Sequence, residues 1–383
     1  MSESFKINQL PCPTWNRLHL NDAVIRNPGQ ALAANTEVPT EFLALAEGVT
    51  HRSISRRTAE TILSRTPEQG RERFVAGKQP IIGDQRFGTG LGKQFDDLLR
   101  EKGGRIELLE TAPGSRIEAP VLWHMDFHDG NRALSEQLIH VGAGSSLTLV
   151  MDYSSEKRDA GFAGISTKVI LDRGASLTLC KVQMLGSRYL HFDDLGVSQE
   201  EESSMTLYQM ELGSKDTYAG VRADLSGKRS SFTSRTAYFA KNDETRDIAY
   251  NIIQRGCRTK SDMTFDGALS GKAVKTFRGT IDFRNGSAGS VGDEQENVLL
   301  LSPDIVNKTI PLILCEEEDV QGRHGATIGR LADDMLFYLE TRGIDRKAAQ
   351  EMMVFARFGA VSREIPEEGL RKRIDEFIRA KFR

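Results

Sequence analysis

The surroundings of one histidine stand out in this chain of 383 residues, which contains seven histidines. His324 lies between Arg323 and Gly325 in the run 321-QGRHGATIG-329, where small side chains let a partner backbone or an ion approach the ring. Neutral imidazole can bind a metal without first losing a strongly held proton. One histidine cannot hold a cluster alone, so His324 is a candidate interface ligand only if a partner chain supplies the remaining ligands. The alternative is a histidine that only hydrogen-bonds across an interface.

Two other motifs suggest metal or nucleotide chemistry but have unsuitable spacing. In 123-WHMDFHD-129 polar and apolar residues alternate, which predicts a strand with a solvated polar face. His124 and His128 would then lie about 13 Å apart, too far to share one ion. The run 87-FGTGLGK-93 fails the Walker pattern, and Lys93 stands where a dinucleotide motif needs glycine. We expect a flexible turn there.

Neither the cysteine spacing nor the known catalytic motifs indicate a metal site or an active site. No C-x-x-C pair is present, so a structural zinc site and a disulfide framework are disfavoured, and no cluster is expected on this chain alone. G-x-S-x-G and H-E-x-x-H motifs are also missing from the sequence. Local motifs alone therefore give no reason to predict an enzyme. Its cysteines are Cys12, Cys180, Cys257 and Cys315.

Composition narrows the class of protein further. A formal net charge of −3 does not favour a nucleic-acid or membrane surface, and no stretch approaches the roughly 20 apolar residues of a membrane span. The opening MSESFKINQL lacks the pattern of a signal peptide, so a cytoplasmic protein is expected. Only 7% of the residues are aromatic while 35 are glycine, which suits many short strands and tight turns.

A weak repeat in the middle of the chain predicts the fold. Five segments with alternating polar and apolar residues have central positions separated by 30, 28, 27 and 31 residues. Such a period, with strand patterns and no helix between the segments, is typical of a β-solenoid. We predict a mainly β protein with a right-handed parallel β-helix over residues 105–328; an antiparallel sandwich is the alternative. The central residues, expected to be buried and stacked in register, are Leu147, Leu177, Met205, Phe232 and Met263.

Helical segments are expected to cover the ends of the solenoid, because open end coils would expose unpaired strand edges. Residues 1–104 are predicted to form an α-rich cap, with helices in 40-TEFLALAEG-48 and 55-SRRTAETILSRT-66. The final strand is expected in 316-EEEDVQGR-323, which would place His324 where the solenoid meets the C-terminal tail.

Residues 329–383 carry three helical patterns. The first starts at Asp333 or Asp334 and stops at Gly343, and Asp345 caps the second. Pro366 suits the first turn of the third helix. The predicted apolar stripes comprise Ala348, Ala349, Met352, Met353 and Ala356 in the second helix, and Leu370, Ile374, Phe377 and Ile378 in the third.

About thirty residues of the tail resemble the C-terminal signature of the SufB/SufD family of iron–sulfur cluster assembly proteins. The resemblance implies a β-helix core with helical ends, as the repeat also predicts. It is closer to SufD, since Gly325 stands where SufB chains carry an acidic residue, and Ile305 falls at their cysteine position if Pro311 is aligned. One difference opposes this assignment, because Gly322 and Arg323 replace the Cys-Ser of many SufD chains. The matching residues are His324 to Thr327, Gly329, Leu336 to Leu339 and Arg342 to Ile344.

The resemblance implies a non-catalytic scaffold subunit of a SufBCD-type complex. Such a subunit pairs with a SufB-like chain, or with a second copy of itself, and binds the SufC ATPase through residues 329–383. A transient iron–sulfur cluster would be shared with the partner through His324. A homodimeric cluster-binding scaffold and a β-helix carbohydrate-active enzyme are the alternatives. The candidate partner-binding residues are Phe337, Tyr338, Arg342, Gly343, Ile344, Met352, Met353 and Phe355.

Overall fold

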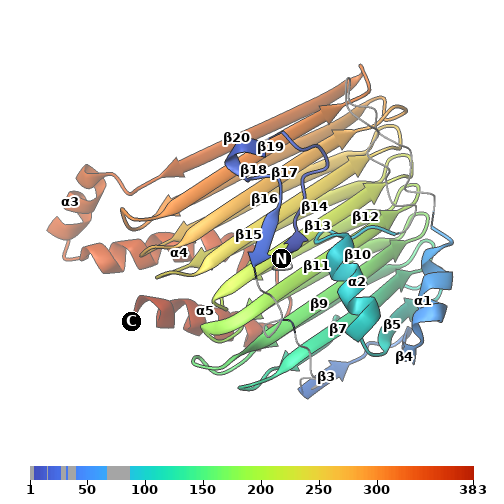
Figure 1. Cartoon of the computed structure of the whole chain (residues 1–383), viewed down its shortest axis with the longest axis horizontal. Coiled ribbons are helices and arrows are strands. Elements are labelled where there is room, and N and C mark those ends of the chain that lie inside the picture. Colours follow the sequence, from blue (N-terminus) through green and yellow to red (C-terminus); the bar gives the residue numbers. More distant parts are fainter. Residues whose placement is uncertain (1–3, 15, 27–31, 33–39, 67–86) are drawn as a thin grey trace.

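The structure is a computed structural model that describes residues 4–14, 16–26, 32, 40–66 and 87–383. Its centre is a parallel β-solenoid made of two sheets, each with nine strands among the described residues (Figure 1). From β5 to β20 consecutive strands alternate between the sheets, and each strand from β7 to β18 pairs with the strands two positions before and after it. The predicted β-solenoid is therefore confirmed, and the sandwich alternative is wrong, because the core pairing is parallel.

The two sheets are named here by the numbering of their strands. The even sheet contains β6 (Val121–Asp126), β8 (Ser146–Ser154), β10 (Ser176–Met184), β12 (Ser204–Glu211), β14 (Ser231–Ala240), β16 (Lys260–Leu269), β18 (Ser290–Leu300) and β20 (Val320–Gly329). The odd sheet contains β5 (Ile106–Thr111), β7 (Arg132–Val141), β9 (Ala160–Leu171), β11 (Arg188–Gln199), β13 (Asp216–Leu225), β15 (Thr245–Gln254), β17 (Val274–Phe283) and β19 (Val306–Cys315). The ninth strand of the even sheet is β3 (Thr40–Ala44), beside β6, and the ninth strand of the odd sheet is β4 (Val49–Ile54), beside β5.

The repeat predicts the ladder of core residues correctly except at its last step. Leu147, Leu177, Met205 and Phe232 pair in consecutive strands of the even sheet. Met263 is buried as expected, but it pairs with Ser234, two residues beyond Phe232. A shift of two residues keeps a side chain on the same face of a strand, so Met263 still enters the core between the sheets.

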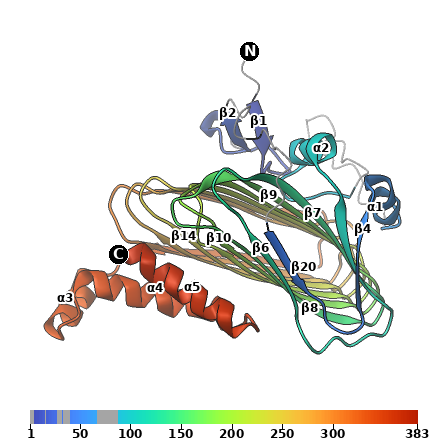
Figure 2. The same cartoon turned by 90° about the horizontal axis from the view of Figure 1, so that it is seen from below.

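The N-terminal segment covers the outer face of the odd sheet and closes one end of the solenoid (Figure 2). It contributes β1 (Ser4–Ile7), η1 (Asn16–Leu18), β2 (Ala23–Arg26), β3 (Thr40–Ala44), β4 (Val49–Ile54), α1 (Arg56–Leu63) and α2 (Lys93–Lys102). The helix predicted in residues 40–48 is wrong, because Thr40–Ala44 pairs antiparallel with β6 and this pairing overrides local helix propensity. The helix predicted in residues 55–66 is confirmed as α1, with Ser55 Oγ accepting from the Thr58 amide at 3.2 Å.

The glycine-rich run at residues 87–93 is a loop packed against the odd sheet, and Lys93 begins α2. Its Gly90 amide donates to the Leu195 carbonyl at 3.2 Å. A Cβ atom on Gly90 would lie 2.0 Å from the Gly220 carbonyl carbon, so the backbones approach too closely for any other residue. Gly90 thus serves backbone packing, whereas Gly92 has a left-handed φ of 89° and open space around it.

The C-terminal segment forms α3 (Asp333–Thr341), α4 (Arg346–Ser362) and α5 (Glu368–Phe382). Asp345 caps α4 as predicted, with its Oδ1 accepting from the Ala348 amide at 2.8 Å, and Gly343 has the left-handed φ of 81°. Pro366 does not enter the first turn of α5, because Glu367 is the N-cap and its carboxylate accepts from the Gly369 amide at 2.9 Å. Thus the three helices are confirmed and one boundary is corrected.

Helices α4 and α5 lie on the outer face of the even sheet (Figure 2). The predicted stripe of α4 is only partly right: Ala349 is buried and Met353 half-buried, whereas Ala348, Met352 and Ala356 are exposed. The stripe of α5 is confirmed, with Phe377 only half-buried. The buried face of α4 comprises Ala349, Val354, Phe358, Val361 and Ser362.

Candidate functional site

The last coil of the solenoid, β19 and β20, has a free edge in the part of the chain that the structure describes. The expectation that His324 follows the final strand is wrong, because β20 begins at Val320 and includes His324. Residues 316–319 form the turn before it. His324 is exposed and lies on the edge strand itself, with no described strand beyond it.

The register of β20 gives the direction of the His324 side chain. His324 pairs with Glu294 of β18, whose side chain is 5% exposed and lies on the inner face of the even sheet. Paired residues of neighbouring parallel strands point to the same face. Arg323 accordingly points outward, where its Nη2 lies 2.6 Å from Asp293 Oδ2. His324 therefore faces the interior at the open end of the solenoid.

Glu294 forms the floor beneath His324. Burial, and then the nearby Glu296, raise the pKa of Glu294 from 4.5 to about 8. Its carboxylate occupies the space left by Gly279 of β17, since a Cβ atom there would lie 1.9 Å from Glu294 Oε2. The open end thus places an imidazole above a buried carboxyl group.

Deeper polar groups line the same interior. Lys275 Nζ lies 2.5 Å from Glu296 Oε1, and Glu296 also accepts from Tyr238 Oη at 2.8 Å and from Thr309 Oγ1 at 2.7 Å. Further along the solenoid, Tyr250 Oη donates to Gln209 Oε1 at 2.6 Å. These polar residues occupy the same alternate positions of their strands as the apolar core residues, so their side chains also point between the two sheets. The interior is therefore apolar in one part and polar in another.

A second polar group in this interior contains His191, Asp193 and Glu211, all fully buried. Burial lowers the pKa of His191 to about 4. Burial, and then the neighbouring Asp193, raise the pKa of Glu211 well above its ordinary value. Sequence reasoning missed these residues because alternation along a strand does not reveal which face lies inside the solenoid. The signal that could have found two of them is their position along β11. His191 and Asp193 lie at the alternate positions between the core residues Tyr189 and Leu195, so they share the inward face of that strand.

The candidate partner-binding residues divide into two groups. Phe337, Tyr338 and Met352 are 68%, 56% and 45% exposed, and the Arg342 guanidinium lies over the Tyr338 ring at 5.3 Å. Arg342 and Gly343 are also exposed. In Figure 1, α3 lies beyond the end of α4 and away from the sheets. These residues, with Met335, form an apolar surface on α3 and α4 that is exposed in the described chain.

The other candidates are less accessible. Met353 and Phe355 are half-buried and pack against the cluster between α4, α5 and the even sheet, and Ile344 is half-buried. Phe355 is also covered by Arg379, whose guanidinium lies 4.7 Å from the ring centre. Their main contacts are thus within the chain.

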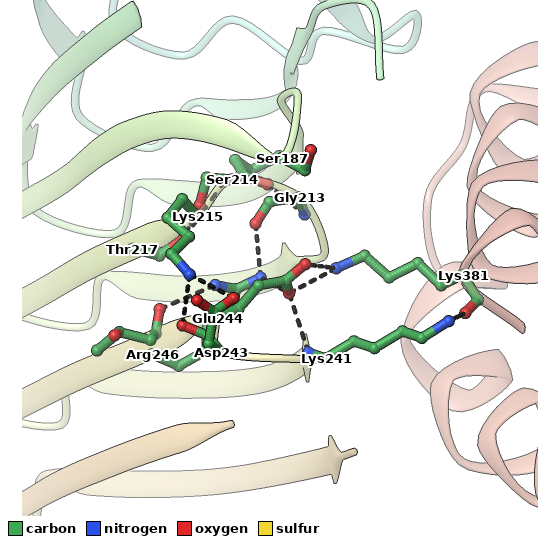
Figure 3. Close-up of polar contacts among 12 residues, drawn as sticks. Ser187, Gly213, Ser214, Lys215, Thr217, Lys241, Asp243, Glu244, Arg246 and Lys381 are labelled. Atoms are coloured by element: carbon green, nitrogen blue, oxygen red, sulfur yellow. Dashed lines mark hydrogen bonds and ion pairs between the residues drawn. The ribbon is translucent and has the colours of Figure 1, made fainter. Parts of the chain in front are cut away.

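A buried ion-pair network fixes α5 to the solenoid (Figure 3). Lys381 Nζ lies 2.8 Å from Glu244 Oε2, and Arg246 Nη2 donates to the same oxygen at 3.1 Å. Burial lowers the pKa of Lys381 to about 8. At the other end of α5, Arg373 Nη1 lies 2.9 Å from Asp152 Oδ2, which also contacts His124 Nδ1 at 2.8 Å. The helices are therefore positioned by charge as well as by apolar packing.

These contacts change the interpretation of the histidine-rich strand. Residues 121–126 form strand β6 as predicted, with Trp123 and Met125 buried. The outward face is only partly solvated, because His124 lies in the Asp152–Arg373 network beside α5. His124 and His128 belong to no group of possible metal ligands among the described residues.

The four cysteines lie in different surroundings. Cys12 and Cys180 are buried, Cys257 is half-buried, and Cys315 is exposed at the end of β19. Burial raises the pKa of the Cys180 thiol to about 12, so this thiol stays protonated beneath the C-terminal helices. The described residues contain no disulfide, and no cysteine joins a group of possible metal ligands there.

None of the described helices is long and apolar enough to cross a membrane. Among curated proteins, the chain is 25% identical to the iron–sulfur cluster assembly protein SufD of Bacillus subtilis over 70% of this chain and 62% of that protein. It is 22% identical to SufD of Escherichia coli over 64% of this chain and 58% of that protein. A chloroplastic SufBD family protein of Arabidopsis thaliana is 24% identical over 48% of this chain and 33% of that protein. The chain thus spans about three fifths of the two SufD proteins that it matches.

The family comparison covers most of the solenoid. Residues 126–357 match the SufBD core domain of SUF system FeS cluster assembly. This match extends from the end of β6 through the open last coil and α3 into α4, so it includes His324 and the exposed apolar residues. Because it covers more than half of the chain, the protein belongs to the SufBD family of the SUF system for FeS cluster assembly.

Proposed function

We propose that the chain is a non-catalytic, cytoplasmic scaffold subunit of a SufBCD-type assembly complex, related to SufD. The free edge of the last coil carries this proposal. Val306 and Ile328 are 43% and 45% exposed there, and an uncovered edge strand can pair with a strand of another chain. A SufB-like solenoid is the partner that we expect, and a second copy of this chain is the alternative.

The exposed apolar surface on α3 and α4 is the proposed binding site for a SufC-like ATPase. Aromatic side chains and arginine are enriched in protein interfaces, and this segment exposes Phe337 and Tyr338, with the Arg342 guanidinium over the Tyr338 ring. Because Lys381 and the apolar cluster hold α4 and α5 on the even sheet, movement of a bound ATPase would be transmitted to the solenoid.

His324 is the proposed contact to a transient cluster. Its ring faces the open interior beside small residues, and the remaining ligands, cysteine or glutamate, would come from the partner. The carbohydrate-active enzyme considered above gains no support from the relatives, whose names describe assembly proteins.

Co-expression with a SufB-like chain and a SufC-like ATPase tests the proposal, with native mass spectrometry of the complex and measurement of its iron content. We expect one SufB-like chain in the complex; two copies of this chain would support the homodimer instead. His324→Ala should keep the complex intact and lower iron after anaerobic reconstitution at least severalfold. His51→Ala, which changes a histidine at the opposite end of the solenoid, is the matched control. Unchanged iron in His324→Ala would mean that His324 has a structural role.

Removing residues 331–383 tests the ATPase site separately. The truncated chain should lose the ATPase, while the SufB-like partner, bound at the edge of β20, should remain. Full ATPase binding by the truncated chain would refute this binding site and leave the edge proposal standing. Because truncation also uncovers the even sheet, Phe337→Ala with Tyr338→Ala in the full chain is the milder second variant.

A further inference from the structure

The fully buried group of His191, Asp193 and Glu211 lies well inside the solenoid, on β11 and β12. One possible ligand atom of each lies within 4.8 Å of those of the other two. The part of the chain that the structure describes contains no second group of this kind. Neither the edge of β20 nor the ATPase site uses these residues, so their arrangement needs a separate explanation.

The hydrogen bonding of His191 fixes which nitrogen is free. His191 Nδ1 lies 3.0 Å from the Ala163 carbonyl oxygen, which can only accept, so Nδ1 carries the proton. In the neutral ring, Nε2 then presents a lone pair, and it has no hydrogen-bond partner. Nε2 faces Asp193 Oδ2 at 4.0 Å. Metal-bound histidines commonly donate their second ring N–H to a carbonyl in the same way.

The two carboxylates also leave an acceptor unused. Gln209 Nε2 donates to Asp193 Oδ2 at 3.3 Å and to Glu211 Oε1 at 2.7 Å, and Lys181 pairs with Asp193 Oδ1. Glu211 Oε2 has no partner, although it is buried. A buried polar atom without a partner destabilises the folded chain, so several such atoms in one place indicate that a cation or a proton binds there.

We propose that His191, Asp193 and Glu211 bind one divalent transition-metal ion inside the solenoid. One imidazole nitrogen and two carboxylate oxygens suit Zn²⁺, Fe²⁺ or Mn²⁺. The hydroxyl of Tyr153, also buried and without a partner, is available as a further contact. Lys181 offsets one carboxylate charge, and the Arg246 guanidinium is committed to Glu244 and the Gly213 carbonyl. The competing occupant is a proton on Glu211.

Zinc content measures the occupant directly. The full chain is expressed in zinc-supplemented medium, which loads the ion during folding because the site is fully buried, and is then washed with a chelator. We expect about one Zn²⁺ per chain by mass spectrometry of the metal. His191→Gln and Glu211→Gln should each lower this content at least tenfold. His140→Gln should leave it unchanged; that half-exposed histidine also lies between two carboxylates, Glu110 and Asp172, but on the outer surface.

Cobalt provides a readout that does not depend on the variants folding. Parent chain produced with Co²⁺ should show visible d–d absorption without the near-ultraviolet band of a cysteine thiolate ligand. Circular dichroism establishes that each variant keeps its β structure. A parent chain without retained metal would show that the site holds only a proton. If His191→Gln retained as much metal as the parent chain, or if His140→Gln lost its metal, the metal would lie elsewhere. Each of these results would overturn the proposal without affecting the partner interfaces.

Discussion

The two ends of the solenoid are built in opposite ways. At the first end, β3 and β4 turn back and pair antiparallel with β6 and β5, and the first core residues are fully covered, with Trp123 only 1% exposed. At the last end, no described strand follows β19 and β20, and His324 and Ile328 are exposed on strand β20. One end is closed by the chain itself, and the other is open in the part of the chain that the structure describes.

The edge strands β4 and β20, at the two ends of the solenoid, also differ in how many charged residues they carry. Strand β4 carries His51 and Arg52, whose nitrogens lie 2.7 and 2.8 Å from Glu107 and Glu110 of β5. Charged edge strands discourage pairing with other chains. In β20 the only residue charged at neutral pH is Arg323, which is paired on the outer face. The rest of β20 is small or uncharged, so this edge lacks the usual protection and is suited to a specific partner.

Truncation of a core residue at the closed end should have the largest effect. Trp123→Ala should lower the free energy of unfolding by about 3–5 kcal/mol, because it leaves a cavity in a fully covered core. Ile328→Ala at the open end should change it by less than about 0.5 kcal/mol in the isolated chain. Urea denaturation compares the two, and equal losses would show that the ends are not different in packing.

Glu294→Gln should have an intermediate effect that depends on pH. The carboxyl group is protonated in the folded chain and ionised in the unfolded chain between pH 4.5 and about 8, so stability is lost as the pH rises through this window. The neutral variant should therefore be more stable than the parent at pH 8, by on the order of 2–4 kcal/mol, and similar to it near pH 4.5. Each pKa unit corresponds to about 1.4 kcal/mol, and water at the open end relaxes part of the penalty.

Urea denaturation at pH 5 and pH 8 measures this difference. Asp293→Asn is the matched control, because Asp293 neighbours Glu294 in sequence but forms an exposed pair with Arg323, and exposed ion pairs contribute little to stability. A parent chain that is equally stable at both pH values would show that the Glu294 carboxyl group is not buried as described.

The sequence predicts the parts of this fold that depend on local periodicity. The repeat gives four of the five ladder positions, and the cap predicted at Asp345 marks a true helix start. It fails where distant contacts decide. Residues 40–44 have helical composition, yet the unpaired edge of β6 draws them into a strand. Alternation cannot distinguish the inner face from the outer one, so the buried charges of the interior were missed.

The candidate site likewise has features that sequence can predict and features that depend on distant contacts. The motif around His324 and the exposed aromatic residues of α3 can be located from sequence, because their residue types are unusual for their positions. The direction in which the His324 side chain points cannot be predicted from sequence. It depends on the register between β20 and β18 and on the space that Gly279 leaves for Glu294. Met353 and Phe355 remain predicted partner-binding residues, but sequence does not reveal that they also pack against the cluster between α4, α5 and the even sheet.

The smallest effect on stability should come from a lysine on the open edge. Ile328→Lys should leave the free energy of unfolding within about 0.5 kcal/mol of the parent, because Ile328 is already 45% exposed. It should nevertheless weaken binding of the SufB-like partner by on the order of tenfold or more, since a charge on an edge strand opposes addition of another strand. Phe42→Lys is the matched control: Phe42 is 61% exposed on β3, the edge strand of the same sheet at the closed end. Native mass spectrometry over a range of partner concentrations measures both. If Phe42→Lys weakened binding and Ile328→Lys did not, the partner would bind at the end that the chain itself closes, and the contrast between the two ends would be reversed.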